Sequence, residues 1–397
     1  MSVDAEPSSA PSRRPEPLPF AQPDITEAEI SAVEATLRSG WLTTGPRVLE
    51  FEAALSAYVG VTNGVALNSG TAALHLALVA IDLTDQDEVI VPTYTFTSTA
   101  EVVRYFGARP VLVDVNPTDL TVDPASVERA ISPRTRAIIG VDVAGEPCDW
   151  PALRTLAEAR GLVLIDDAAH ALPTRLDGRL IGSWADMTAF SFYVTKPLTT
   201  GEGGMLVTNN TAWADRVRSM SLHGISHHAW KRYEGLGSWY YEVLDAGFKY
   251  NLTDVAAAMG LVQLHRLEEM WHRRQEIRHQ YDEAFADLEA VQRPRTREGS
   301  ESSCHLYLLR LNLDRLSIDR AEFILRLAAE NIGTSVHFIP LHAHPYYRHL
   351  LGVRDEDFPV AASEYPRVIS LPIYSRMTDA DVGDVVRAVQ VVANGAS

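Results

Sequence analysis

The chain has 397 residues, of which 46% are hydrophobic and 22% are charged, and its formal net charge is −17. This composition predicts a folded protein with a sizeable core and excludes a chain that is disordered throughout. The negative charge argues against nonspecific nucleic-acid binding, which needs a basic surface, and no apolar run has the length of a membrane span.

Residues 1–23 carry prolines at positions 7, 11, 15, 17, 19 and 23. They predict a flexible or extended tail. They also lack the apolar stretch of a secretory signal, so we expect a cytoplasmic protein. Thr26-Glu27-Ala28-Glu29 has the pattern of a capping box, and apolar residues follow at helical spacing as far as Gly40.

Short apolar segments separated by helical patterns fill residues 61–210. The predicted strands are Val65–Asn68, Glu88–Val91, Pro110–Val113, Ala137–Val143, Leu162–Ile165, Met187–Phe192 and Met205–Thr208. Helical patterns include Ala72–Ala80 and Pro151–Arg160. Near-continuous apolar strands between helices predict an α/β fold with a mostly parallel seven-stranded sheet, covered on both faces.

The pattern changes in the second half of the chain. Residues Val255–Ala286 predict long helices, and a mixture of strands and helices follows after about residue 300. The later predictions are a strand at His305–Leu311, a helix at Arg320–Asn331, a strand at Thr334–His337 and a helix near Asp379–Val392. We therefore expect a tail (1–23), a large domain (24–280) and a smaller α+β domain (281–397).

The first motif is Asn68-Ser69-Gly70-Thr71-Ala72-Ala73-Leu74, where a predicted strand passes into a predicted helix. Small residues at such a junction let backbone N–H groups approach a phosphate, and the helix N-terminus adds a partial positive charge. An ordinary turn between a strand and a helix would have the same pattern, so both interpretations stay open.

The second motif is Leu164-Ile165-Asp166-Asp167-Ala168-Ala169-His170, with two carboxylates at the end of an apolar strand. Their burial is unfavourable unless a charged or hydrogen-bonding group meets them. A protonated pyridine nitrogen of pyridoxal phosphate (PLP) would be such a group. Capping of a helix by one of the two residues is the alternative.

The third motif is Phe190-Ser191-Phe192-Tyr193-Val194-Thr195-Lys196-Pro197, followed by Leu198-Thr199-Thr200-Gly201-Glu202-Gly203-Gly204. A single lysine is usually a solvated surface charge. Lys196 lies between an apolar strand and a glycine-rich turn, where burial would lower its pKa and make it a usable amine.

Together, these motifs resemble fold-type I PLP enzymes and, more closely, the DegT/DnrJ/StrS family of sugar aminotransferases. The resemblance extends from about residue 20 through nearly the whole chain. It is supported by four further segments: Ser39–Pro46, Pro92–Thr97, Lys249–Asp254 and Val336–Tyr347.

The resemblance implies a PLP-dependent aminotransferase that works by a ping-pong mechanism. Lys196 would bind PLP covalently and move a proton during the reaction. Asp167 would pair with the pyridinium nitrogen, and His170 would lie near the ring and its phenolic oxygen. A branch of the family that has histidine in place of the lysine performs dehydration, and Lys196 argues against that branch.

The same resemblance implies the remaining cofactor contacts. Phe96 would stack on the ring, and Gly70, Thr71 and Ser191 would hold the phosphate. Asn251 would reach the phosphate of the other subunit's cofactor, so we expect a homodimer with shared active sites.

Two departures from the family pattern concern the strand ends. The family usually has Glu-Asp where this chain has Asp166-Asp167. A neighbouring strand often ends in His-Leu-Tyr-Gly, whereas this chain has Val141-Asp142-Val143-Ala144-Gly145. The resemblance therefore assigns no substrate contact to the segment Val141–Gly145.

The resemblance also implies the substrates, with L-glutamate as amino donor and a keto-sugar as acceptor, most often a nucleotide-diphosphate 4-keto-6-deoxyhexose. Relatives often serve antibiotic or surface-glycan pathways. The basic and aromatic segment Leu222–Tyr233 could meet a diphosphate and a base, although a solvated loop is equally compatible with it. The candidate substrate contacts are Trp41, Thr43, His223, Arg232 and His337.

Other functions stay open as alternatives. A cyclitol aminotransferase acting on a keto-inositol would use the same cofactor chemistry, and a PLP lyase or a noncatalytic PLP-binding protein is also conceivable. Cys148 and Cys304 lack the motif of a desulfurase. No acidic residues lie near His337, His342 and His344, so we expect no metal site there.

Overall fold

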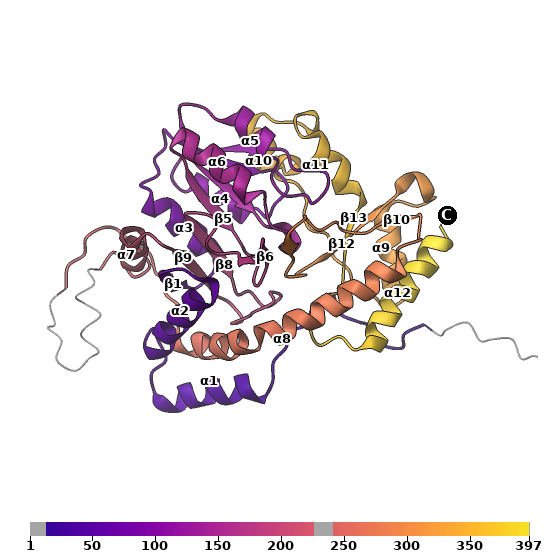
Figure 1. Cartoon of the computed structure of the whole chain (residues 1–397), viewed down its shortest axis with the longest axis horizontal. Coiled ribbons are helices and arrows are strands. Elements are labelled where there is room, and N and C mark those ends of the chain that lie inside the picture. The colour runs from indigo at the N-terminus through magenta and orange to yellow at the C-terminus, as the bar shows by residue number, and fades with distance from the viewer. Residues whose placement is uncertain (1–12, 226–240, 397) are drawn as a thin grey trace, which may run out of the picture.

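A seven-stranded sheet forms the centre of the structure. The computed structural model describes residues 13–225 and 241–396 (Figure 1). The strand order is β1-β9-β8-β5-β4-β2-β3. The strands are β1 Asn63–Leu67, β2 Glu88–Pro92, β3 Arg109–Val113, β4 Thr135–Val141, β5 Val163–Asp167, β8 Met187–Ser191 and β9 Gly204–Thr208. All seven predicted strands are confirmed, with their ends displaced by a few residues.

The sheet is parallel except at β9, which runs antiparallel to both β1 and β8. The pairs of β5 with β4 and with β8 are parallel. The carboxyl ends of these strands therefore lie at one edge of the sheet, where ligands bind in folds of this kind. Nearly every residue of these strands is buried, as expected for a sheet covered on both faces.

Helices cover both faces of the sheet. They are α2 Pro46–Val59, α3 Gly70–Ala80, α4 Ser98–Arg104, α5 Pro124–Ala130, α6 Trp150–Arg160 and α7 Thr211–Met220. Helix α1, Glu27–Ser39, packs instead against helix α8, Asp254–Ala284. One core contains side chains of α3, α4 and α7, and the other contains side chains of α2, α5 and α6. The capping box at Thr26 and Glu29 is confirmed, and Gly40 ends α1 with a left-handed φ of 77°. Helices α2 and α7 were not predicted.

Helix α8, Asp254–Ala284, links the sheet to the C-terminal part (Figure 1). It packs against α1 and α2 and, further along, against α12, Asp379–Asn394. The predicted domain boundary at residue 280 stays a prediction, because α8 continues unbroken through that position.

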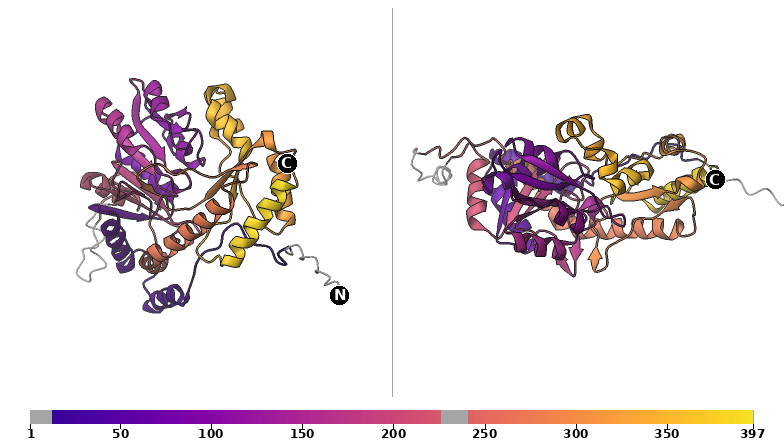
Figure 2. Two further views of the ribbon diagram at one scale, coloured as in Figure 1. Left: turned by 45° about the vertical axis from the view of Figure 1, so that its right-hand side comes forward. Right: turned by 90° about the horizontal axis from the view of Figure 1, so that it is seen from above.

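The C-terminal part has a small antiparallel sheet in the order β10-β12-β13. It lies to one side of the large sheet, and Figure 2 shows it from two further directions. Its elements are β10 Val291–Gln292, β12 Tyr307–Leu311, β13 Val368–Leu371, α9 Arg320–Ala329, α10 Pro345–Leu351 and α11 Pro359–Glu364. A second small sheet joins β6 Arg175–Leu176, β7 Arg179–Leu180 and β11 Ser300–Glu301.

Two expectations need correction. The predicted strand Thr334–His337 is wrong, because this segment makes a single bridge, Ser335 to Ser370, and the sheet's third strand is β13. The flexibility predicted up to residue 23 is wrong for its last part. Leu18 is 3% exposed and bridges to Ile332, because its apolar side chain completes the core of the C-terminal part.

Across residues 13–225 and 241–396, the structure contains no helix that is both long and apolar enough to cross a membrane.

An ion pair between α7 and α2 offers a test of the packing on β1. Arg218 Nη1 lies 2.8 Å from Oε2 of the buried Glu52, whose Oε1 accepts from the N–H of Ala66. Replacing Arg218 by Met leaves this carboxylate unpaired, so we expect a loss of about 2–3 kcal/mol in the free energy of unfolding, measured with urea.

Arg216, on the same helix as Arg218, provides the matched control, since its ion pair with Asp245 is more exposed. Arg216→Met should cost less than about 1 kcal/mol. Equal losses in the free energy of unfolding for the two variants would show that the buried ion pair stabilises the fold no more than the exposed one.

Candidate active site

Lys196 follows strand β8 and lies near the carboxyl end of β5. Its backbone N–H donates to the carbonyl of Tyr193 at 2.9 Å, which forms a tight turn after the strand. The side chain is half-buried. Burial lowers the pKa of the Lys196 amine to about 8, and the negative charge of Asp167 acts in the opposite direction. Near neutral pH an appreciable fraction of this amine is uncharged and able to react with a carbonyl.

Asp167 is the last residue of β5 and is 5% exposed. Thr99 Oγ1 donates to its Oδ2 at 2.8 Å, and the N–H of Ala169 donates to its Oδ1 at 3.3 Å. Burial raises the pKa of Asp167, and these donors and the positive charge of Lys196 oppose that shift. A buried carboxylate of this kind is stabilised by a cation, and a pyridinium N–H would be one.

The other end of the candidate site is the N-terminus of α3. Ser69 caps the helix by accepting from the N–H of Ala72 at 3.0 Å. Gly70 lies against Ser191, since a Cβ on Gly70 would come within 2.9 Å of the Ser191 Cβ. Two of the predicted phosphate contacts are thus in direct contact, and Thr71 follows in the first turn of α3. The partial positive charge of a helix N-terminus favours a phosphate at this place.

Three imidazoles lie around Lys196. His170, His305 and His337 are close enough for the positive charge of Lys196 to lower their pKa values, although burial is the larger cause for each. The rings of His170 and His305 are 4.4 Å apart between centroids. The N–H of Ala144 donates to Nδ1 of His170 at 3.1 Å, so the ring carries its proton on Nε2 when it is neutral.

His337 reaches the site from the C-terminal part of the chain. Its Nδ1 lies 2.8 Å from the hydroxyl of Ser370, and its backbone carbonyl accepts from the fully buried Tyr94 at 2.6 Å. Burial lowers the pKa of His337 to about 4, and Lys196 adds to the shift. Of the candidate substrate contacts within the described residues, His337 is the one that the structure brings beside Lys196.

Phe96 lies at the mouth of the site, and its ring is 58% exposed. The ring of Phe338 is 6.1 Å from that of Phe96 and 5.7 Å from that of His170, between centroids. An exposed aromatic face linked through Phe338 to His170 can pack against a flat cofactor ring. This position is compatible with the predicted stacking role of Phe96.

Three further predicted residues form a separate group near the N-terminus of α2. Asn251 Nδ2 donates to Thr44 Oγ1 at 2.7 Å, and the carbonyl of Thr43 accepts from the N–H of Asp254 at 3.1 Å. The indole of Trp41 donates to the carbonyl of Thr44 at 3.3 Å. The chain next to Asn251 also contacts the α3 region, since the N–H of Asn68 donates to the carbonyl of Tyr250 at 2.7 Å.

Of the last two candidate substrate contacts, only His223 lies within the described residues, and it does not join the group at Lys196. His223 has an exposed side chain, and its backbone N–H donates to the carbonyl of Phe248 at 2.8 Å. Arg232, with most of the basic segment Leu222–Tyr233, lies outside the described residues. In the part of the chain that the structure describes, no three His, Cys, Asp or Glu side chains are grouped so that they could hold a metal ion.

Behind Asp167, two other carboxyl groups are fully buried. Asp142 and Asp166 are each 0% exposed. Burial raises the pKa of Asp142 to about 7 and that of Asp166 well above its usual value, and the nearby carboxylates add to both shifts. Near neutral pH Asp166 therefore holds a proton and Asp142 holds one in part of the molecules, while Asp167 has the positive charge of Lys196 beside it.

Sequence reasoning missed Thr99 and His305, which both belong to the site. Thr99 lies close to the segment Pro92–Thr97, and its polar neighbours gave no sign that its hydroxyl would meet Asp167. His305 begins the predicted strand at residues 305–311, far along the chain from the three motifs. Its position next to His170 arises only when the C-terminal part packs onto the large sheet.

The residues present fit PLP. A half-buried lysine with a lowered pKa lies beside a buried aspartate, and a helix N-terminus with a close-packed glycine lies at the end of the neighbouring strands. These groups match the aldehyde, the pyridine nitrogen and the phosphate of this cofactor.

Comparisons with known proteins agree with this site. The sequence profile of the DegT/DnrJ/EryC1/StrS aminotransferase family matches residues 23–390. The spore coat polysaccharide biosynthesis protein SpsC of Bacillus subtilis is 47% identical over 380 residues, which cover 96% of this chain and 98% of that protein.

Two solved structures have the same fold. Spr1654 of Streptococcus pneumoniae in its PLP-form is 35% identical with a TM-score of 0.88, and the match covers 96% of this chain and 99% of that one. PseC of Helicobacter pylori, an aminotransferase involved in the biosynthesis of pseudoaminic acid, is 27% identical with a TM-score of 0.89, and the match covers 96% and 100%. The expected fold, cofactor and enzyme class are confirmed. The chain belongs to the DegT/DnrJ/EryC1/StrS family of PLP-dependent sugar aminotransferases.

Proposed function

We propose that the enzyme moves the amino group of L-glutamate to a nucleotide-diphosphate-linked 4-keto-6-deoxyhexose. The observation that carries the proposal is the lowered pKa of Lys196 beside the buried Asp167. A sugar acceptor is supported by the relatives, since PseC takes part in pseudoaminic acid biosynthesis and SpsC in that of a spore coat polysaccharide. The products would be 2-oxoglutarate and the amino sugar.

Each residue of the site has a chemical task in this reaction. PLP, when bound, provides an electron sink for the charge left on the substrate carbon. Asp167 holds a proton on the pyridine nitrogen, and the uncharged amine of Lys196 takes the substrate proton and returns it one carbon away. His170, with its proton on Nε2, donates toward the phenolic oxygen. Gly70, Thr71 and Ser191 hold the phosphate, and Phe96 covers the ring.

A homodimer would complete each site. We propose that Asn251 of the partner subunit contacts the phosphate, so that two chains share each site. Exposed aromatic rings next to the site support an interface there: Phe96 is 58% exposed and Tyr346 is 57% exposed. Burial of such rings in an interface stabilises an assembly.

A cyclitol aminotransferase acting on a keto-inositol is the second candidate. Lys196, Asp167 and the phosphate site would act in the same way, because the cofactor chemistry is identical. The two functions differ in whether a nucleotide must be bound, and the basic segment Leu222–Tyr233 favours the nucleotide. A PLP lyase would release its product without an amino acceptor.

The first prediction concerns Lys196. Wild-type protein with PLP should have a visible absorption band of the bound cofactor, and L-glutamate should remove it while 2-oxoglutarate forms in equal amount. Lys196→Ala should lose both properties. Lys196→Arg keeps the positive charge but not the reactive amine, and it should fail in the same way. An Arg variant that still turns over would contradict the assignment.

The second prediction concerns pH. Lys196 reacts with an aldehyde as the uncharged amine, and its pKa is about 8. The rate at which the protein without cofactor captures PLP should therefore rise with pH, with a midpoint near 8, and level off above it. Asp167→Asn removes the charge that raises this pKa, so its midpoint should lie lower.

Nα-acetyl-lysine is the control, because it reacts with PLP through a free side-chain amine and so includes any titration of PLP itself. Its exposed amine has a pKa of about 10.4. A midpoint near that value in the protein would contradict the role of burial at Lys196.

The third prediction separates the two acceptors. If a diphosphate meets the basic segment, Arg232→Ala should raise the KM for the sugar nucleotide roughly tenfold and leave the KM for L-glutamate within about twofold. Arg160, in the exposed last turn of α6, is the matched control, and its Ala variant should change neither value. Equal effects of Arg232→Ala on both substrates, or turnover of a keto-inositol alone, would favour the cyclitol reaction.

A further inference from the structure

Ser303 connects the two adjacent histidines of the site, His170 and His305. It lies between β11 and β12 in the C-terminal part and is 0% exposed. Its hydroxyl donates to the backbone carbonyl of His170 at 2.5 Å and accepts from the backbone N–H of His305 at 3.3 Å. One side chain therefore holds both residues whose rings lie 4.4 Å apart between centroids.

Thr174 fixes Ser303 from the side of the large sheet. Its hydroxyl accepts from the N–H of Ser303 at 2.9 Å and donates to the carbonyl of Gly145 at 2.7 Å. Gly145 has a φ of 95°, and a Cβ there would lie 2.0 Å from the Ser303 hydroxyl. The neighbouring Ala144 donates its N–H to the ring of His170. This closed set of buried hydrogen bonds orients the backbone and the ring of His170 together.

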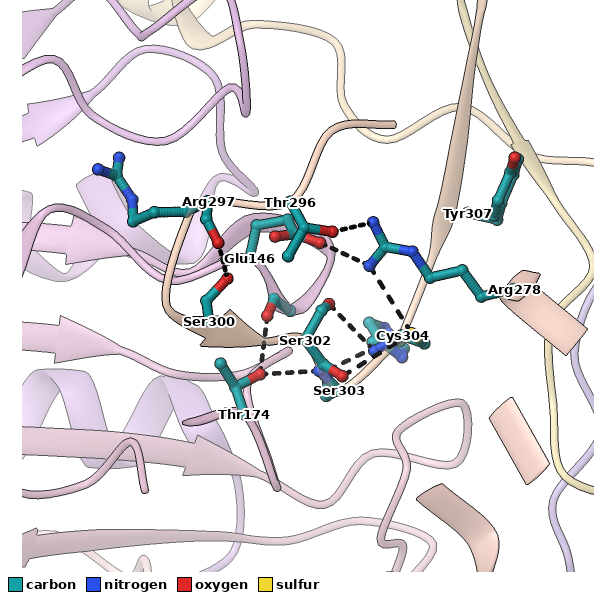
Figure 3. Close-up of polar contacts among 12 residues, drawn as sticks. Glu146, Thr174, Arg278, Thr296, Arg297, Ser300, Ser302, Ser303, Cys304 and Tyr307 are labelled. Carbon is teal, nitrogen blue, oxygen red and sulfur yellow. Dashed lines mark hydrogen bonds and ion pairs between the residues drawn. The ribbon is translucent and has the colours of Figure 1, made fainter. Parts of the chain in front are cut away.

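Helix α8 holds the same segment from the opposite side. Arg278 Nη1 lies 2.8 Å from Glu146 and contacts the sulfur of Cys304 at 3.8 Å, and Figure 3 shows these contacts together with the bond between Thr174 and Ser303. Arg274 donates to the carbonyl of Cys304 at 3.3 Å. Cys304 has a φ of 51°, which is unfavourable for a residue with a side chain. Such a conformation persists where surrounding contacts impose it, and it lies directly between Ser303 and His305.

His305 has one nitrogen, Nδ1, that is buried and has no hydrogen-bond partner within the described residues. Its ring is thus held by packing against His170 and by its backbone, not by hydrogen bonds at Nδ1. A shift of the Ser303 segment would move both rings with respect to Lys196, whose charge acts on each of them.

We propose that Ser303, held by Thr174, is a positioning residue that fixes the His170 and His305 rings in one tilted contact beside Lys196. The C-terminal part of the chain then belongs to the catalytic site through this hydroxyl. The proposal rests on the proposed function for its effect on the reaction, while its effect on the imidazoles can be measured without cofactor.

The experiment compares four variants of the full chain. Ser303→Ala removes the connecting hydroxyl. Thr174→Val removes the hydroxyl behind it at nearly constant volume, whereas Thr174→Ser keeps that hydroxyl. Ser300→Ala is the matched control, because its hydroxyl donates at 2.7 Å to the carbonyl of Arg297 in the same segment and does not contact either histidine.

The first measurement is the histidine side-chain ¹H–¹⁵N spectrum of the protein without PLP. His170 and His305 signals are assigned with His170→Gln and His305→Gln. We expect both signals to shift in Ser303→Ala and in Thr174→Val, and to stay in place in Thr174→Ser and Ser300→Ala. Signals of His170 and His305 that do not move in Ser303→Ala would overturn the proposal.

The second measurement uses the protein with PLP. We expect a roughly tenfold lower kcat for the L-glutamate half-reaction in Ser303→Ala and in Thr174→Val, with a KM within about twofold of wild type and a shifted pH titration of the bound cofactor's absorption. The double variant Ser303→Ala/Thr174→Val should lose little more kcat than either single variant, since both substitutions act through one hydrogen-bond network. Fully additive losses, or equal losses in Ser300→Ala, would overturn the proposal.

The two proposals can fail separately. If wild type captures no PLP, the proposed function fails, and the spectrum of the protein without cofactor still decides whether Ser303 positions the imidazoles. If wild type transfers the amino group of L-glutamate but Ser303→Ala has wild-type kcat and pH titration, only the positioning role fails. A Ser303→Ala variant that does not fold leaves Thr174→Val against Thr174→Ser to decide in the same way.

Discussion

The active site depends on the placement of an amine and a carboxylate at the ends of adjacent parallel strands, away from bulk water. Burial disfavours the charged form of both groups, so it lowers the pKa of Lys196 and raises that of Asp167. Their mutual attraction limits both shifts. A cofactor that offers an aldehyde to the amine and a pyridine nitrogen to the acid satisfies both groups at once, and the parallel pairing of β5 with β8 determines their separation.

The same burial explains how the chain accommodates a second aspartate before Asp167. Asp166 and the neighbouring Asp142 have no exposed surface, and their pKa values are raised by burial and by the charge of nearby carboxylates, Asp167 among them. In the neutral form they add little negative charge behind the cofactor. Asp167 has, besides the donors Thr99 and the N–H of Ala169, the positive charge of Lys196, which favours its ionised form. The nearby charge of Lys196 thus favours the ionised form at Asp167.

The C-terminal part contributes to the site through residues far from the three motifs. His337 and His305 reach Lys196 from this part, and Ser303 and Thr174 join it to the loops after β4 and β5. Helix α8 supports the contact with Arg278, which pairs with Glu146. The surroundings of Lys196 are therefore built from two parts of one chain that pack together.

The sequence by itself determined the seven strands and the motif residues at their ends, because apolar runs, glycine-rich turns and charged residues at strand ends are local patterns. The roles expected of Lys196 and Asp167 came from the resemblance of these motifs to a family. It did not determine the strand at Val368–Leu371, which was expected instead at Thr334–His337, since short strands of a small sheet are chosen by their partners. The contacts of His305, Ser303 and Thr99 were decided by the tertiary structure alone. Their partners lie far away in the sequence, and only the packing of the C-terminal part, β5 and α4 against one another brings these polar groups within hydrogen-bonding distance.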